Sequence, residues 1–113
     1  MTIILVVGQD RGFALAFAPE VVAHLDAIER KLHGQIRKQI RLRLSSEPEK
    51  ETRNRKTLDV PAAFGAQWEL RFGPGNRFRV FYEVDAEART VTILAIGVKD
   101  RNVLRIGAEE YRT

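Results

Sequence analysis

Residues 67–84 read QWELRFGPGNRFRVFYEV, and this stretch decides the fold. Apolar and polar side chains alternate on both sides of the Gly-Pro-Gly-Asn cluster, which is the period-two pattern of a half-buried β-hairpin. A symmetric turn places Phe72 opposite Phe78 and Arg71 opposite Arg79. One face of the hairpin is then apolar and aromatic, and the other carries two guanidinium groups. The same register pairs Leu70 with Val80 and Trp68 with Tyr82.

The two facing arginines indicate an anionic partner. Like charges directly opposite each other on a sheet are destabilising, so the pair either splays into solvent or is kept for an anion. Arginine presents a planar fork of donors that suits phosphate. Two other interpretations stay open at this point: the arginines are simply solvated, or Arg79 pairs with Glu69 or Glu83. On the apolar face, we expect Trp68 and Tyr82 to be core residues rather than platforms for stacking bases.

A dense basic segment precedes the hairpin. Residues 30–58 contain ten basic and three acidic side chains, which gives this segment a net charge of +7 in a chain whose total is +4. Such a segment favours a polyanion, either nucleic acid or an acidic protein. The alternative is a solvated helix face followed by a loop. The candidate RNA contacts are Arg37, Arg41, Arg53, Arg55 and Lys56.

Two amphipathic helices are expected before the hairpin. Pro19 suits the first turn of a helix, and apolar residues recur at helical spacing as far as Leu32, with Gly34 as the stop. A second helix is expected over residues 35–45, so that the two form an αα-hairpin. Residues 46–66 read as a long loop.

The remaining segments predict strands. Residues 3–7 are consistent with a short strand, and residues 13–17 with a second strand or the continuation of the first. Residues 90–97, TVTILAIG, form a nearly continuous apolar run, which predicts a central strand. The tail from residue 98 onward is expected to hold a short helix or turn. The chain is therefore predicted to be α+β, a small antiparallel sheet with the αα-hairpin packed on one face.

Composition narrows the class of protein. The 113 residues suit one domain, residues 1–113. No apolar run reaches the length of a membrane span, and no signal peptide is expected. The chain has no cysteine and two histidines, so a zinc site is not expected and no metal or cofactor is implied. The absence of cysteine fits a reducing compartment, and we expect a cytoplasmic protein.

Five segments follow one another along the chain: FAPEVVAHLDAI, NRKTLD, WELRF, NRFRVFYEVD and TVTILAIGVKDR. Taken in this order, they resemble the RelE/ParE superfamily of toxins from bacterial type II toxin–antitoxin modules. The resemblance covers most of residues 13–111 and implies the same α+β fold with an N-terminal αα-hairpin. RelE-like members cleave mRNA, usually on the ribosome, by attack of the 2′-hydroxyl on the adjacent phosphate.

The resemblance also implies roles for individual residues. Arg79 occupies the position of the core phosphate-binding arginine, and Arg71 falls near a catalytic lysine. Lys99 falls where a second catalytic arginine stands, with Arg101 just beyond it. Tyr111 is the candidate for a C-terminal tyrosine that stacks or relays a proton. The chain departs from the RelE pattern in two ways: Glu69 stands where a lysine is expected, and Tyr111 stands farther from Gly97 than the pattern expects. No histidine lies near the C-terminus, unlike in the branch that uses a Glu and His pair as base and acid.

Function and partners are left with alternatives at this point. The resemblance favours an mRNA-cleaving toxin that a cognate antitoxin, acidic or amphipathic, holds inactive by covering the basic face. A ParE-like toxin that poisons DNA gyrase and a noncatalytic RNA-binding domain are the other two interpretations. The candidates for a general base are Lys99, Glu69 and Glu83.

Overall fold

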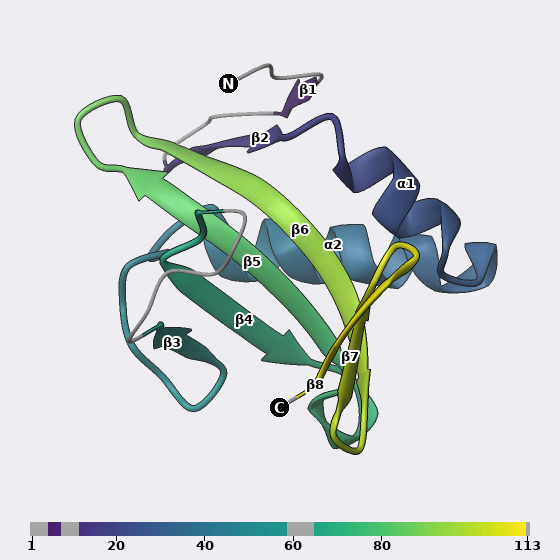
Figure 1. Cartoon of the computed structure of the whole chain (residues 1–113). Helices are drawn as coiled ribbons and strands as arrows, with labels where there is room; N and C mark the ends of the chain where they lie inside the picture. Colours follow the sequence, from purple (N-terminus) through teal and green to yellow (C-terminus); the bar gives the residue numbers. More distant parts are fainter. Residues whose placement is uncertain (1–4, 8–11, 59–64, 113) are drawn as a thin grey trace.

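The computed structural model describes residues 5–7, 12–58 and 65–112, and these form an α+β fold in which helices cover one face of a sheet (Figure 1). The predicted fold class is confirmed. The helical segments are α1 (Val21–Asp26), the 3₁₀ turn η1 (Arg30–Leu32), α2 (His33–Leu44) and the 3₁₀ turn η2 (Pro74–Asn76). The strands are β1 (Leu5–Val7), β2 (Ala14–Phe17), β3 (Arg55–Thr57), β4 (Trp68–Phe72), β5 (Phe78–Asp85), β6 (Thr90–Asp100), β7 (Val103–Ile106) and β8 (Glu109–Arg112).

Strand β6 is the centre of the sheet, as the apolar run predicted. The order is β1-β2-β6-β5-β4-β3, and β7 pairs with both β6 and β8. β5 runs along the length of β6, whereas β2 and β7 pair with opposite ends of its other edge. The β2–β6 pairing is parallel, and the other pairings among the described residues are antiparallel. β1 is a strand separate from β2.

The hairpin register is confirmed residue by residue. In the β4–β5 pair, Arg71 lies opposite Arg79 and Phe72 opposite Phe78, and the two phenylalanine rings lie 5.5 Å apart. The turn depends on Gly73, whose φ is +82° and whose added Cβ would lie 2.4 Å from the Phe78 ring. A glycine here allows both the left-handed backbone and the close approach of the ring. Local turn chemistry therefore fixes which face each arginine occupies.

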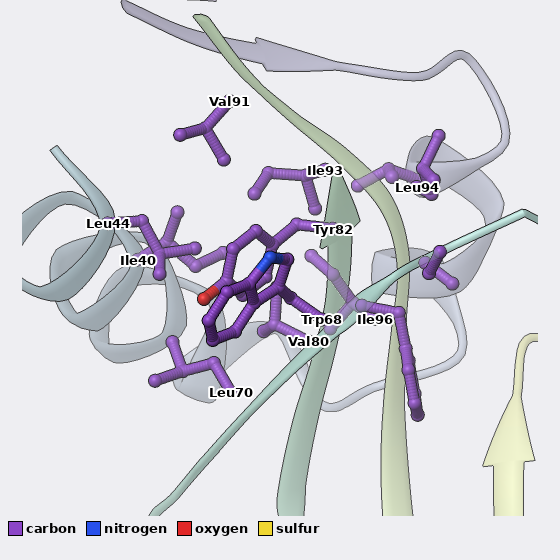
Figure 2. Packing of buried hydrophobic residues seen from close by; sticks show 14 of the residues in the cluster. Ile40, Leu44, Trp68, Leu70, Val80, Tyr82, Val91, Ile93, Leu94 and Ile96 are labelled. Atoms are coloured by element: carbon purple, nitrogen blue, oxygen red, sulfur yellow. The ribbon is translucent and has the colours of Figure 1, made fainter. Parts of the chain in front are cut away.

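The core lies between the hairpin and α2. Ile40 and Leu44 of α2 pack toward the indole of Trp68 and the ring of Tyr82 (Figure 2). These two rings stack with centroids 6.0 Å apart, and the buried Tyr82 hydroxyl donates a hydrogen bond to the Pro48 carbonyl at 2.7 Å. The expectation that Trp68 and Tyr82 are core residues is confirmed.

The boundary between the two helices is not where Gly34 predicted it. Helix α1 ends at Asp26, and Glu29 is extended, with φ −51° and ψ 131°. Gly34 lies inside the first turn of α2. The imidazole Nε2 of His33 lies 2.8 Å from the Ile28 carbonyl oxygen, which ties the start of α2 to the bend. The chain turns early because Ile28 and Leu32 both pack against the core on either side of the bend.

Two segments without predicted strands pair with the sheet. Part of the expected loop forms β3, whose Lys56 lies opposite Glu69 of β4. Of the helix or turn expected after residue 97, the described residues form turns and no helix: β6 continues to Asp100, and β7 and β8 follow as a hairpin. Arg101 and Gly107, with φ of +58° and +62°, make the two tight turns possible. These short strands form because the end of β6 offers an unpaired edge.

Candidate nucleic-acid interface

Arg71 and Arg79 share the sheet face that α2 does not cover. Side chains alternate between the two faces along a strand, and Leu70 and Val80 point toward α2 in the core (Figure 2). Their neighbours Arg71 and Arg79 therefore emerge on the opposite face. The register places them directly across from each other, as the sequence predicted.

Glu69 joins the two arginines. Its Oε1 accepts a hydrogen bond from Arg71 Nε at 2.8 Å, and its Oε2 accepts one from Arg79 Nη1 at 3.3 Å. The Glu69 side chain is 7% exposed, so the carboxylate is buried between its partners. Of the alternatives left open by the sequence, the pairing of Arg79 with Glu69 is the one observed. Because both oxygens are engaged, Glu69 is a poor candidate for a general base.

Backbone groups hold both arginines in place. Arg79 Nε donates a hydrogen bond to the Asn76 carbonyl at 2.8 Å, so the η2 turn fixes the guanidinium from a second side. The backbone N–H of Arg71 donates to the Asn54 carbonyl at 2.8 Å, and Asn54 Nδ2 donates back to the Arg71 carbonyl at 2.9 Å. The loop before β3 thus braces the strand that carries Arg71.

Lys99 and Arg101 lie beside a hollow at one end of the sheet. Gly97 of β6 pairs with Arg79, and Lys99 follows two residues later on the same face, about 7 Å along the strand. The backbone N–H of Lys99 donates to the Arg77 carbonyl at 2.7 Å, which joins the η2 turn to β6. The hollow has a volume of about 440 Å³. Its lining residues are Pro74, Gly75, Arg77, Lys99, Asp100 and Arg101.

Sequence reasoning did not nominate Arg77. Arg77 directly follows the Gly-Pro-Gly-Asn cluster, in a hairpin that already carries Arg71 and Arg79. This position was the only indication of Arg77 in the sequence. The fold places it beside Lys99 and Arg101, so three cations and one carboxylate, Asp100, surround the hollow. The excess of positive charge suits an anion such as a phosphate group.

Tyr111 lies apart from the arginine pair. On β8 it pairs with Leu104 of β7, which in turn pairs with Lys99 of β6. Two strand spacings, about 10 Å, therefore separate the backbone of Tyr111 from that of Lys99. Tyr111 lines a different hollow of about 240 Å³, together with His24 and Leu94. The structure does not bring this tyrosine together with Arg71 and Arg79.

The candidate RNA contacts are divided between the two sides of the sheet. Arg55 faces the helices, where its Nη1 donates to the Arg43 carbonyl at the end of α2 and its buried Nε has no partner among the described residues. Arg37 and Arg41 are exposed on α2. Lys56 is exposed, and its place opposite Glu69 puts it on the arginine face. Arg53 is exposed in the loop before β3.

A match to a protein-family model shows which family the chain belongs to. Residues 15–103 match the model of the ParE toxin of the type II toxin–antitoxin system parDE. The chain belongs to this family of toxins. The family implies an antitoxin as partner, and the match supports the resemblance to the RelE/ParE superfamily. No curated protein and no solved structure matches the chain significantly.

The family match covers most of the candidate interface of this toxin. It extends from β2 to the first residue of β7 and includes Arg71, Arg79, Lys99 and Arg101. Tyr111 lies beyond the matched residues. Among the residues that the structure describes, no group of three or more His, Asp or Glu side chains could hold a metal ion. No helix in the same part of the toxin is long and apolar enough to cross a membrane.

Proposed function

We propose that this toxin cleaves mRNA in the cytoplasm, in free or ribosome-bound form, and that its arginine face binds the scissile phosphate. The observation that carries the proposal is the row of cations on the sheet face opposite α2. In this row, Arg79 lies opposite Arg71 and pairs with Gly97, two residues before Lys99. Preorganised donors of this kind stabilise the charge that develops on phosphate oxygens in the transition state. Arg101 and Arg77 extend the row toward the hollow.

The chemistry needs no metal. The 2′-oxygen attacks the adjacent phosphorus, the bond to the 5′-oxygen of the next nucleotide breaks, and a cyclic phosphate and a 5′-hydroxyl result. A base takes the proton of the 2′-hydroxyl, and the leaving oxygen gains a proton. Lys99 is the remaining candidate for the base, since Glu69 is engaged by both arginines. Glu83 lies four residues from Arg79 along β5, about 13 Å away.

The antitoxin is the second ligand of this face in the proposal. The toxin has a net charge of +4, and an acidic or amphipathic antitoxin segment that covered Arg71 and Lys99 would exclude RNA by direct competition. Because opposite charges would hold such a segment on the toxin, its affinity should fall with added salt.

A second candidate function rests on Glu69. One carboxylate already reduces the charge of the arginine pair, and the matched family is described as the ParE toxin of parDE systems. A ParE-like toxin acts on DNA gyrase rather than RNA, and the arginine pair would then stabilise a protein-binding face. This function does not require a free phosphate site or a general base.

Induced expression separates the two candidates. We expect growth arrest with new 5′ ends in cellular mRNA, detected by primer extension, and cleavage of RNA by the purified toxin. Growth arrest with intact mRNA and gyrase-dependent DNA breakage would contradict the proposal and support the second candidate. Salt-sensitive RNA binding without cleavage, growth arrest or DNA breakage would instead indicate a noncatalytic RNA-binding domain.

A further inference from the structure

We infer that Glu69 is a positioning residue, which holds Arg71 and Arg79 together as one site for a single phosphodiester. The inference rests on the proposed function in one respect, the identity of the anion as part of RNA. Its geometric content, that one buried carboxylate orients both forks, stands on the contacts of the three side chains.

The carboxylate makes an otherwise unfavourable arrangement stable. Arg71 and Arg79 face each other across the β4–β5 pair, where like charges repel. Glu69 lies two residues before Arg71 on the same face and contacts both guanidinium groups, one through each oxygen. The three groups together carry a net charge of +1. The pair can therefore stay in place in the absence of an external anion.

The contacts leave the two arginines with different tasks. Among the described residues, the side chain of Arg71 is hydrogen-bonded through Nε alone, so both of its Nη groups remain for a ligand. Its side chain is 35% exposed. Arg79 is held by Asn76 and Glu69 and is 10% exposed. Arg71 thus makes the main contact with the phosphate, while Arg79 supplies a fixed charge beneath it.

Burial argues that Glu69 is a permanent part of the site rather than a plug that the ligand displaces. A phosphate that took over both arginines would leave an unpaired carboxylate in a side chain that is only 7% exposed, and a buried charge without its partner is strongly unfavourable. The phosphate must instead bind on the outer side of Arg71, with Glu69 in place. Glu69 then acts on the reaction through the arginines, without touching the substrate.

The test compares two substitutions that remove the same charge. Glu69→Gln keeps the size of the side chain, but an amide can accept from one arginine only. Glu110→Gln breaks the exposed ion pair with Arg105, in which the side chains are 52% and 54% exposed. For Glu69→Gln we expect kcat of RNA cleavage to fall about 100-fold, as misplacement of a positioned group can cause, with KM unchanged or lower because a negative charge is lost. Glu110→Gln should keep the wild-type kcat.

Glu69→Asp is the control that separates a loss of positioning from a folding defect. It keeps the charge, but the shorter arm cannot reach both arginines, so we expect a similar loss of kcat in a protein that still unfolds in one cooperative transition, at a lower thermal midpoint than the wild type. An unchanged kcat in either Glu69 variant, or an equal loss in Glu110→Gln, would overturn the inference.

A second measurement does not depend on cleavage. In nuclear magnetic resonance spectra of the toxin labelled at arginine, we expect slow solvent exchange of Nε–H in both Arg71 and Arg79. In Glu69→Gln the Arg71 signal should exchange about tenfold faster, since its hydrogen bond to a charged group is lost. Arg79, which keeps its bond to Asn76, should change less. Unchanged exchange at Arg71 would overturn the positioning role.

Inorganic phosphate tests the anion site separately. Titration of the wild type should shift the Arg71 signals more than those of Arg105. In Glu69→Gln, the difference between the Arg71 and Arg105 shifts should be smaller. If phosphate shifts Arg71 but RNA stays intact, the proposed function fails while the site stands. If phosphate leaves Arg71 unaffected, the phosphodiester site is wrong even if RNA is cleaved.

Discussion

At the scale of single residues, the guanidinium of Arg79 is held more tightly than that of Arg71 on the same sheet face. Its guanidinium is buried between Glu69 and the Asn76 carbonyl, close to the turn of the hairpin and next to the central strand. The facing charges alone suggest that removing Arg79 would relieve repulsion and stabilise the fold. Glu69 reverses that expectation, because it would lose one of its two partners while remaining buried.

Arg79→Ala is therefore expected to abolish growth inhibition and also to lower stability. Loss of one preorganised group that stabilises the charge of the transition state typically costs about two to three orders of magnitude in rate. Loss of a hydrogen bond to a charged group costs about 1.5–3 kcal/mol of stability. Arg79→Lys should restore little activity, because a point charge cannot bind Glu69 and Asn76 as the fork does. Growth on induction and urea unfolding followed by circular dichroism measure the two effects. A folded Arg79→Ala protein with full toxicity would contradict the catalytic role.

At the scale of elements, the hairpin and α2 depend on Trp68. Its indole stacks on Tyr82 beneath Ile40 and Leu44 of α2. Trp68→Ala should lower the free energy of unfolding by about 3–5 kcal/mol, the cost of truncating a large core aromatic. Leu42→Ala, at a position of α2 that is exposed, should cost much less. Equal unfolding midpoints for the Trp68 and Leu42 variants would contradict the observed packing.

Along part of β6, a histidine of α1 accepts a backbone hydrogen bond in the place where a neighbouring strand would accept it. Between the segments paired with β2 and β7, the backbone N–H of Ile96 donates a hydrogen bond to His24 Nδ1 at 3.3 Å. Burial lowers the pKa of His24, and the nearby Glu20 partly opposes this effect. A neutral ring is required, because a proton on Nδ1 would break the bond. Other titratable side chains line the two hollows beside the ring: Glu20, Glu29, Arg77, Arg105, Glu109 and Tyr111.

The toxin should therefore lose stability as the pH falls below about 6.5, the ordinary pKa of histidine. In this range the unfolded chain binds a proton at His24 more readily than the folded chain does, so protonation favours unfolding. The contribution is fully present at higher pH. His24→Ala should flatten the decline in unfolding free energy between about pH 7 and pH 5. His33→Ala, which removes the ring bonded to the Ile28 carbonyl and leaves His24 in place, should retain the decline. An unchanged slope in His24→Ala would contradict this account.

At the scale of the whole molecule, the sheet separates two basic surfaces. Arg71, Arg79 and Lys99 lie on the sheet face opposite α2, whereas the exposed Arg37 and Arg41 belong to the helix layer. Under the proposed function, a short single strand of RNA that contacts the arginine pair would follow this face toward the hollow lined by Arg77, Lys99 and Arg101.

Salt dependence of binding to a short RNA identifies the surface used. Each neutralised phosphate of a single strand contributes about 0.7 to the slope of log affinity against log salt. Replacement of Arg77, Lys99 and Arg101 by glutamine should reduce the slope by about 2, while replacement of Arg37 and Arg41 should leave it nearly unchanged. The opposite pattern, measured by fluorescence anisotropy, would show that RNA follows α2 instead.

The sequence alone determined the α+β class, the central strand and the register that sets Arg71 opposite Arg79. These features depend on alternation and turn residues within about 20 neighbouring positions, so local physics specifies them. Only the tertiary structure decided the parallel β2–β6 pairing, the strands β3, β7 and β8, and the separation of Tyr111 from the arginines. Short strands form where another strand has a free edge. The sequence of β6 did not show that part of its edge would be free for β7. The contact of Glu69 with both arginines depended on the sequence and on the tertiary structure. The register brought the three charged side chains together, and burial of Glu69 keeps its carboxylate paired with the two guanidinium groups.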